Sequence, residues 1–307
     1  MRPYLRVLTP LLVIVMAVVL AGCGEQYIVL DPKGPIGSTQ RDLIVITTVL
    51  CSIIIVPVLI MTAVIGWRYR DRKGSKAKYK PNWDHNSKLE FTWWSIPIVI
   101  IIILAAITAK YTFELEPSKA MASTEEPVVI EVTSLDWKWL FTYPEEGIAT
   151  VNYIKIPEDR PIRFQLTSDI TMNSFWIPQL GGQLYTMSGM AMTLYLQADE
   201  PGTYFGTGAN FTGKDFAQMT FDVDAVSDEE YAAWIDEVKA TDNELTDEGF
   251  EKLRQRGTSD VQLFSAFPEG LFQKVMTQFA VGGMSHHHHG VIDAPADSND
   301  QGSHAGH

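Results

Sequence analysis

Two long uncharged runs constrain this chain more than any other feature of its sequence. Residues 43–67 carry no charged side chain over 25 positions, and residues 91–109 carry none over 19. A helix rises ~1.5 Å per residue, so each run can cross the roughly 30 Å hydrocarbon core of a bilayer. Buried helices of a soluble protein are the alternative, but two such runs around a basic loop favour a membrane hairpin. We therefore predict transmembrane helices over residues 43–67 and 91–112.

The loop between these runs sets their orientation. Residues 68–90 contain eight Lys or Arg against three Asp or Glu. An excess of basic residues marks a short loop as cytoplasmic, so both outer ends of the hairpin face away from the cytoplasm. Glu90 ends this loop and opens the second run. It is either a solvated carboxylate favoured by the helix dipole or a proton-collecting group at the mouth of a channel.

The N-terminus resembles a bacterial lipoprotein signal. Arg2 and Arg6 precede an apolar core over residues 11–20, and Leu20-Ala21-Gly22-Cys23 follows directly. The core is short for a membrane span. In signals of this type the cysteine is acylated and becomes the mature N-terminus, which predicts a lipid anchor at Cys23. The alternatives are an ordinary signal peptide, or an uncleaved helix, with an incidental cysteine.

From residue 127 onward, short β-type runs alternate with turn residues, which is typical of a small sandwich or barrel. After residue 226 the pattern becomes helical, with segments over residues 227–239, from Thr246, and over residues 269–279. The resulting divisions are residues 1–22 as signal peptide, 23–42 as extracytoplasmic segment, 43–67 as first span, 68–90 as cytoplasmic loop, 91–112 as second span, 113–226 as β domain, 227–280 as helical extension and 281–307 as disordered His-rich tail. The strands are expected over residues 128–132, 137–141, 163–166, 174–177, 193–197 and 219–223.

The distribution of cysteine and histidine limits the chemistry of the exported domain. Cys23 and Cys51 are the two cysteines of the chain, and no histidine occurs between residues 86 and 285. A copper electron-transfer site needs thiolate and imidazole together. The exported domain is therefore predicted to be copper-free and to hold no other metal. Its acidic character, in a chain of net charge −13, argues against a nucleic-acid partner.

Several motifs together resemble subunit II of the haem-copper oxidases. The resemblance implies a two-helix transmembrane hairpin followed by an all-β cupredoxin-like sandwich. One motif, Leu89-Glu90-Phe91-Thr92-Trp93-Trp94-Ser95-Ile96-Pro97, looks like the start of the second helix in that family. Another, Asp136-Trp137-Lys138-Trp139, resembles its aromatic strand, and Asn173-Ser174-Phe175-Trp176-Ile177-Pro178-Gln179-Leu180-Gly181 is similar to the loop that carries its first copper ligand.

Matched position by position, the resemblance implies that the copper site of this family is lost. Cytochrome c oxidases hold a dinuclear copper centre with two histidines, two cysteines, a methionine and a backbone carbonyl. The corresponding positions here are Asn173 and Phe216 for the histidines, Gly208 and Thr212 for the cysteines, Asn210 for the carbonyl donor and Met219 for the methionine. A thioether alone is a weak ligand, so Met219 cannot hold copper by itself.

This loss is typical of the quinol-oxidising branch of the family. The resemblance implies a non-redox subunit of a proton-pumping quinol:oxygen oxidoreductase in a bacterial cell membrane. Subunit I then carries haem, copper and the quinol site, and small membrane subunits complete the complex. Residues 29–35 and the lipoprotein signal that ends at Cys23 look most like the corresponding segments of the menaquinol oxidases of Gram-positive bacteria, with those of ubiquinol oxidases second. The resemblance also favours a proton-uptake role for Glu90.

Two other functions compete with this one. A non-catalytic membrane lipoprotein for copper handling or sensing would also fit a cupredoxin-like domain on a hairpin. A cytochrome c oxidase fails because the copper ligands are missing, and with them the need for cytochrome c as a partner. The run His286–His289 in the tail is expected to bind metal weakly and without catalytic meaning.

Overall fold

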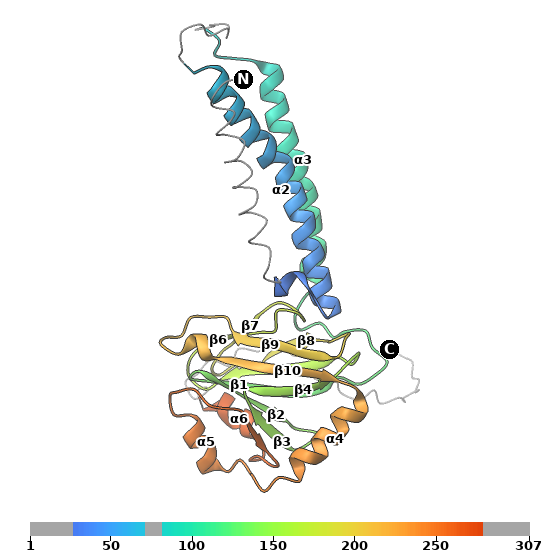
Figure 1. Cartoon of the computed structure of the whole chain (residues 1–307), viewed down its shortest axis with the longest axis vertical. Helices are drawn as coiled ribbons and strands as arrows, with labels where there is room; N and C mark the ends of the chain where they lie inside the picture. Colours follow the sequence, from blue (N-terminus) through green and yellow to red (C-terminus); the bar gives the residue numbers. More distant parts are fainter. Residues whose placement is uncertain (1–26, 71–81, 279–307) are drawn as a thin grey trace, which may run out of the picture.

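The computed structural model describes residues 27–70 and 82–278 and places two long helices on one end of a β-sandwich (Figure 1). A short 3₁₀ turn, η2 (Ile28–Leu30), precedes helix α2 (Pro35–Arg68), and α3 (Ser87–Glu114) returns to the sandwich. At ~1.5 Å per residue both helices exceed the hydrocarbon thickness of a bilayer. Both are long and apolar enough to cross a membrane.

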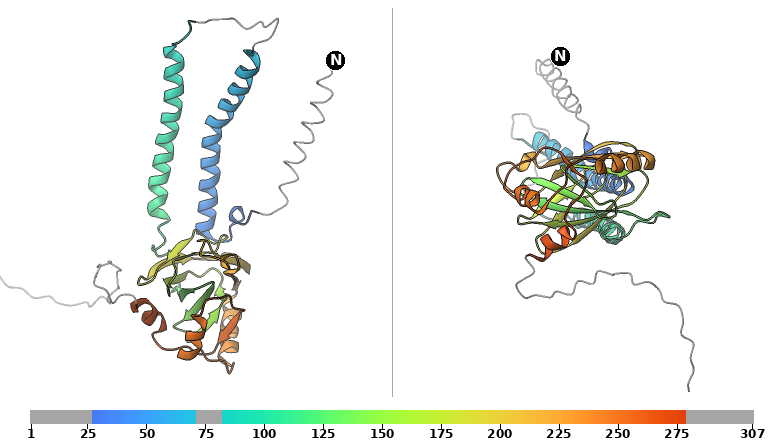
Figure 2. Two further views of the ribbon diagram at one scale, coloured as in Figure 1. Left: turned by 90° about the vertical axis from the view of Figure 1, so that its left-hand side faces the viewer. Right: turned by 90° about the horizontal axis from the view of Figure 1, so that it is seen from below.

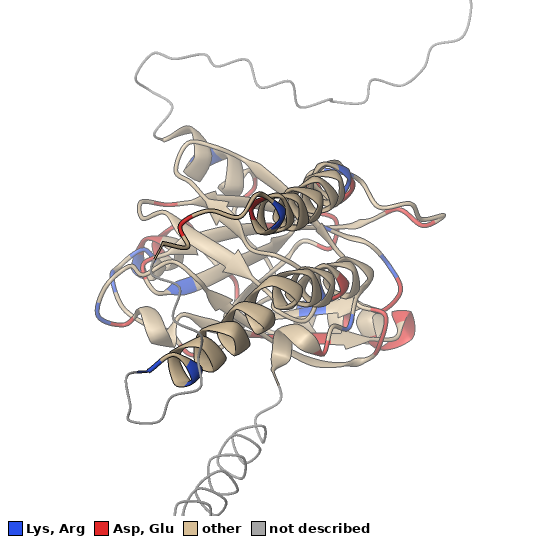
Figure 3. Ribbon diagram, turned by 90° about the horizontal axis from the view of Figure 1, so that it is seen from above, with Lys and Arg blue, Asp and Glu red and all other residues tan. Residues whose placement is uncertain are grey.

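Local sequence explains where the two helices begin and bend. Pro35 occupies the first helical turn of α2, where its missing N–H costs nothing. The side chain of Asn86 caps α3 by accepting from the backbone N–H of Leu89 at 3.1 Å. Pro57 lies inside α2, which bends along its length and diverges from α3 away from the sandwich (Figure 2). The charged residues of both helices lie toward their ends (Figure 3).

Helix α2 begins eight residues before the uncharged run at 43–67, and this extra length packs on the sandwich. The backbone N–H of Gly37 donates to the carbonyl of Leu180 at 3.0 Å, and that of Lys33 donates to Gln179 at 2.8 Å. The Nζ of Lys33 also contacts Glu200 at 2.8 Å. The hairpin is thus joined to the domain at both helices' outer ends.

The sandwich consists of two sheets. One has the strand order β11-β3-β2-β1-β5-β8 and the other β4-β10-β9-β6-β7. Within the described residues, β1 pairs with β5 and β10 with β4 in parallel, and the other strand pairs are antiparallel. The strands are β1 (Val128–Leu135), β2 (Lys138–Tyr143), β3 (Ile148–Val151), β4 (Tyr153–Pro157), β5 (Ile162–Ser168), β6 (Asn173–Trp176), β7 (Leu184–Thr186), β8 (Met192–Leu196), β9 (Gly202–Gly208), β10 (Thr220–Val226) and β11 (Gln262–Phe264).

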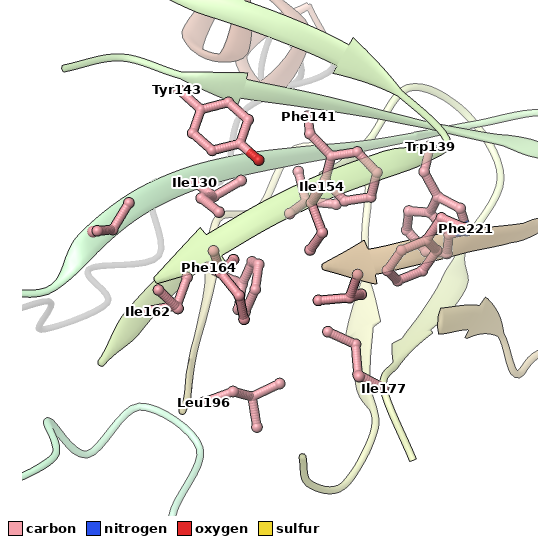
Figure 4. Close-up of a cluster of buried hydrophobic side chains, with 14 of the residues drawn as sticks. Ile130, Trp139, Phe141, Tyr143, Ile154, Ile162, Phe164, Ile177, Leu196 and Phe221 are labelled. Carbon is pink, nitrogen blue, oxygen red and sulfur yellow. The ribbon is translucent and has the colours of Figure 1, made fainter. Parts of the chain in front are cut away.

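Aromatic side chains fill the space between the sheets (Figure 4). Alternate residues of β2 point inward, and among them Trp139 and Phe141 are fully buried. Phe175 of β6 stacks on Phe221 of β10 with ring centroids 5.2 Å apart, and Trp139 meets Phe175 edge-on at 5.4 Å. Offset and edge-to-face pairs of this kind add to the burial of the rings.

The C-terminal extension packs on the sandwich in two places. Its first helix adds Tyr231, Trp234 and Val238 to the main core, and later residues such as Phe250 and Leu271 cover the outer face of the first sheet. It contains the predicted helices as α4 (Asp228–Lys239), α5 (Asp247–Leu253) and α6 (Leu271–Thr277). It also contributes β11, which pairs antiparallel with β3. The sequence had predicted only helices in this part of the chain, so this strand was missed. A second apolar cluster forms there between Leu140 and Val151 of the sheet and Phe250 of α5, among other residues. The extension is therefore an integral layer of the domain.

Candidate functional site

The positions matched to the copper ligands gather at one end of the second sheet. Asn173 begins β6, Gly208 ends β9, and Met219 immediately precedes β10. The backbone N–H of Gly208 donates to the carbonyl of Met219 at 2.9 Å, and Ala209 donates to Ser174 at 2.9 Å. The connection between β9 and β10 carries the remaining three positions. Sheet pairing thus brings the six predicted positions into one neighbourhood.

Asn173 is held in a buried polar network. Its side chain is 1% exposed, and its Nδ2 donates to Ser134 Oγ at 3.2 Å and to the carbonyl of Thr171 at 3.1 Å. Thr186 Oγ1 donates to the same Ser134 hydroxyl at 3.0 Å. The Asn173 amide therefore joins β6 to β1, and through Ser134 to β7, and so stabilises the fold.

The side chain of Met219 fills the space beside Gly208. Met219 is fully buried, and a Cβ added at Gly208 would lie 3.2 Å from its sulfur. The indole N–H of Trp139 donates to the carbonyl of Met219 at 3.4 Å. The thioether thus packs as part of the hydrophobic core and has no room beside it for a larger side chain at position 208.

The other three positions offer no ligand set either. Asn210 donates to the carbonyl of Met172 at 3.1 Å, Phe216 packs against Phe211 at 5.6 Å, and the hydroxyl of Thr212 is buried without a hydrogen-bond partner. Amide, hydroxyl, phenyl and thioether groups do not fit a copper electron-transfer centre. Within residues 27–70 and 82–278, no three His, Cys, Asp or Glu side chains gather to hold a metal.

The extension adds Arg256 to this neighbourhood, which sequence reasoning missed. Trp137 adopts a left-handed backbone conformation with φ 66°, and the Arg256 guanidinium lies 4.5 Å from its ring centroid. Arg256 Nε also lies 3.6 Å from Asp136 Oδ2. A cation over an indole face is a favourable contact. No local pattern could have paired residues so distant in the sequence.

Glu90 occupies the first turn of α3, at the end of the hairpin remote from the sandwich. Its Oε1 lies 2.8 Å from His85 Nδ1, and both side chains are exposed, at 40% for Glu90 and 62% for His85. His85 Nε2 in turn lies 3.0 Å from Ser87 Oγ. The sequence singled out Glu90 but not its histidine partner. Cys23 and His286–His289 lie outside the described residues.

Comparisons with known proteins place the chain in a family. The profile described as "Cytochrome C oxidase subunit II, periplasmic domain" matches residues 145–226. The ubiquinol oxidase subunit 2 of Acetobacter aceti is 41% identical over 268 residues, covering 87% of this chain and 86% of that protein. The quinol oxidase subunit 2 of Bacillus subtilis is 43% identical over 265 residues, covering 85% and 82%. The chain belongs to the quinol oxidase subunit II family.

The family explains the combination of hairpin and sandwich. As a quinol oxidase subunit II, the chain is a membrane protein with a cupredoxin-like extracytoplasmic domain, and the alternative of a separate copper-handling lipoprotein is not favoured. Among solved structures, the periplasmic domain of subunit II of the cytochrome oxidase of Bradyrhizobium japonicum aligns with a TM-score of 0.36 at 23% identity, covering 38% of this chain and 96% of that one. The curated relatives show that the chain is one subunit of an oxidase complex.

Proposed function

We propose that this subunit carries no redox centre and serves assembly and proton uptake in a quinol oxidase that reduces oxygen to water and pumps protons. The donor set at the former copper positions carries this proposal. Asn173 is engaged with Ser134, and Met219 is packed in the core. The Oδ1 of Asn173 is buried without a hydrogen-bond partner, but an amide oxygen and a thioether do not make a copper electron-transfer site without thiolate and imidazole. Residues 127–278 contain neither cysteine nor histidine.

The chemistry of quinol removes the need for a copper relay. Quinol dissolves in the membrane and delivers its electrons there, whereas a soluble donor would need a relay on the exported domain. Haem, copper and the quinol site are then assigned to subunit I. We propose menaquinol as the quinol, on the basis of residues 29–35 and of the lipoprotein signal that ends at Cys23. Cys23 would add a lipid anchor to the two spans.

The hairpin offers subunit I and the small subunits a docking surface. Apolar side chains on both helices are exposed, including Leu59 at 62% on α2 and Phe91 at 74% on α3. The helices diverge away from the sandwich, so each presents separate faces to lipid and to partner helices (Figure 2). Close packing between membrane helices stabilises such assemblies.

The carboxylate at the other end of the hairpin supports the proton-uptake role. Glu90 and His85 form an exposed ionisable pair on the side of the membrane that the basic loop assigns to the cytoplasm. Exposed groups of this type can exchange protons with water and pass them on. We propose that Glu90 collects protons for a channel into subunit I and that His85 positions its carboxylate.

Metal and quinone analysis of the purified complex tests the main proposal. The complex is extracted in mild detergent, and haem, copper and quinone are quantified together. The copper of subunit I alone is expected; two further copper atoms per complex would show a dinuclear centre on this subunit. If the chain is isolated without any haem-bearing partner, the proposed role in assembly is contradicted. Co-purification of ubiquinone in place of menaquinone would correct the choice of quinol.

A further inference from the structure

A cavity of about 430 Å³ opens between β2 and the C-terminal extension, and no acidic residue lines it. Volumes of this order accommodate small ligands. Three cations and no carboxylate thus line this cavity, in a chain of formal net charge −13. Its polar lining includes Lys138, Lys252, Arg256, Thr258, Ser259 and Gln262.

Lys138 lies at the base of this cavity. Its side chain belongs to a residue that is 3% exposed, and its Nζ donates to the carbonyls of Leu253 at 2.9 Å and Gln255 at 2.7 Å. An ammonium group has three N–H donors, so one remains. Within the described residues, no carboxylate lies within 4.0 Å of this Nζ. Burial lowers the pKa of Lys138, and the charge of Asp136 opposes that shift.

Two further cations face the same cavity. Lys252 lies in the last turn of α5 and forms no ion pair with any described residue. Arg256 contacts Asp136 and the ring of Trp137, yet its side chain is 62% exposed. A guanidinium carries five N–H donors, so these contacts leave most of them available.

A purely structural role explains only part of this arrangement. Lys138 caps the C-terminal end of α5, where carbonyl groups carry partial negative charge. That role accounts for two of its N–H groups, but not for the gathering of Lys252 and Arg256 without a carboxylate in the lining. Asp136 pairs with Arg256 at 3.6 Å from outside this lining, and a bound anion would bring a negative charge to Lys138 and Lys252 as well.

We propose that this cavity binds a small soluble oxyanion with phosphate or carboxylate chemistry. The Lys138 ammonium, Lys252 and Arg256 would supply charge, and the hydroxyls of Thr258 and Ser259 would supply further hydrogen bonds. Because α5 lies at the end of the sandwich remote from α2 and α3, the ligand comes from the aqueous phase and not from a lipid headgroup (Figure 1). Such a ligand would tie β2 to the extension.

Thermal unfolding of the full chain in detergent tests this site, independently of the oxidase activity. Inorganic phosphate is titrated against chloride at equal ionic strength. Phosphate should raise the Tm in a saturable manner, since a ligand that binds the folded state stabilises it. The double variant Lys252→Gln/Arg256→Gln should weaken phosphate binding by about tenfold or more, because it removes two charge-assisted contacts. Lys138 is left intact because it caps α5.

A matched control removes two charges elsewhere. The double variant Lys239→Gln/Lys274→Gln changes α4 and α6 outside the cavity lining and should keep the full phosphate response. An equal response in both double variants, or a response no larger than that to chloride, would overturn the proposal. Stabilisation by phosphatidate in the micelle without any by inorganic phosphate would overturn the aqueous source.

Discussion

Arg254 of the C-terminal extension binds the carboxylate of Asp169, which lies in the connection between β5 and β6. Arg254 Nε donates to both carboxylate oxygens of Asp169, at 3.1 and 3.0 Å. Asp169 is 3% exposed, and Gln278 Nε2 adds a hydrogen bond to its Oδ1 at 2.7 Å. The extension therefore fixes the connection between β5 and β6, and with it the start of the strand that carries Asn173.

Breaking this ion pair is expected to destabilise the exported domain. Asp169→Ala removes the buried carboxylate that pairs with Arg254, which keeps only its exposed contacts with Glu251 and Gln278, at a cost of about 2–3 kcal/mol. For a domain of this size that lowers the Tm by roughly 5–10 °C. Circular dichroism of the full chain in detergent measures the change. Lys274→Gln is the matched control: its pair with Asp247 is largely exposed on both sides, so the loss should stay within about 1 kcal/mol. Equal losses would contradict the structural role of Asp169.

The junction between α2 and the sandwich depends on glycine. A Cβ at Gly34 would lie 2.1 Å from the carbonyl oxygen of Gln197, and one at Gly37 would lie 2.8 Å from that of Gln179. Both obstacles are backbone atoms, so neither can rotate away. Gly34→Ala should therefore push the helix off the domain, at a cost of about 1–3 kcal/mol.

Limited proteolysis of the purified chain measures this loosening. Cleavage near the junction should become about tenfold faster in Gly34→Ala, because the rate follows the population of the opened form. Gly66→Ala serves as control, since a Cβ there meets nothing within 4 Å. If Gly34→Ala and Gly66→Ala are cleaved alike, the close approach does not hold the junction.

Cys23→Ala should abolish lipid labelling while the protein stays in the membrane. Acylation alone gives modest anchoring, whereas two apolar helices hold the chain far more firmly. Metabolic labelling with a fatty acid, followed by carbonate extraction, measures both properties. Release of the variant into the soluble fraction would count against the two-span topology. Labelling that persists without Cys23 would place the acyl group on another residue.

The membrane hairpin and most of the strands could be predicted because their patterns are local. The apolar runs required two spans, and β1, β2, β5, β6, β8 and β10 each overlap a predicted segment, to within one residue at its edge. Strand β9 escaped prediction because three of its seven residues are glycine, which ordinarily marks a turn. Gly206 is there because a Cβ would lie 2.2 Å from the ring of Phe221. The three-residue strands β7 and β11 carry too little pattern to detect and depend on their partners.

For the candidate site, too, the sequence predicted one part and missed another. Its positions followed from the position-by-position match to the family, but its contacts depend on segments far apart in the sequence. Lys138 reaches carbonyls 115 and 117 residues away, and Trp137 is covered by Arg256. His85 lies five residues before Glu90, and only the geometry of the capped helix start brings the two side chains together. The long-range contacts follow from tertiary packing and the His85 contact from the local cap, and periodicity encodes neither.

Glu90→Gln should slow proton delivery without disturbing the fold. The substitution keeps size and hydrogen-bonding capacity but removes the carboxylate, and the side chain is 40% exposed, so folding loses little. Turnover of the purified oxidase at saturating quinol should fall severalfold while haem content stays normal. The loss should be partial because Asp84 or water can supply protons nearby.

Two control variants distinguish a loss of proton uptake at Glu90 from a general effect of removing a carboxylate from α3. Glu114→Gln makes the same change at the opposite end of α3, where the carboxylate meets Lys110 at 3.8 Å, and should leave turnover unchanged. His85→Gln should lower turnover less than Glu90→Gln, because a positioning residue acts only through the carboxylate that it holds at 2.8 Å. Turnover is compared from about pH 6 to about pH 9, because the proton concentration in the surrounding water falls steadily over that range. Equal turnover in Glu90→Gln and the parent across that range would leave Glu90 as a charge that favours the start of α3 through the helix dipole.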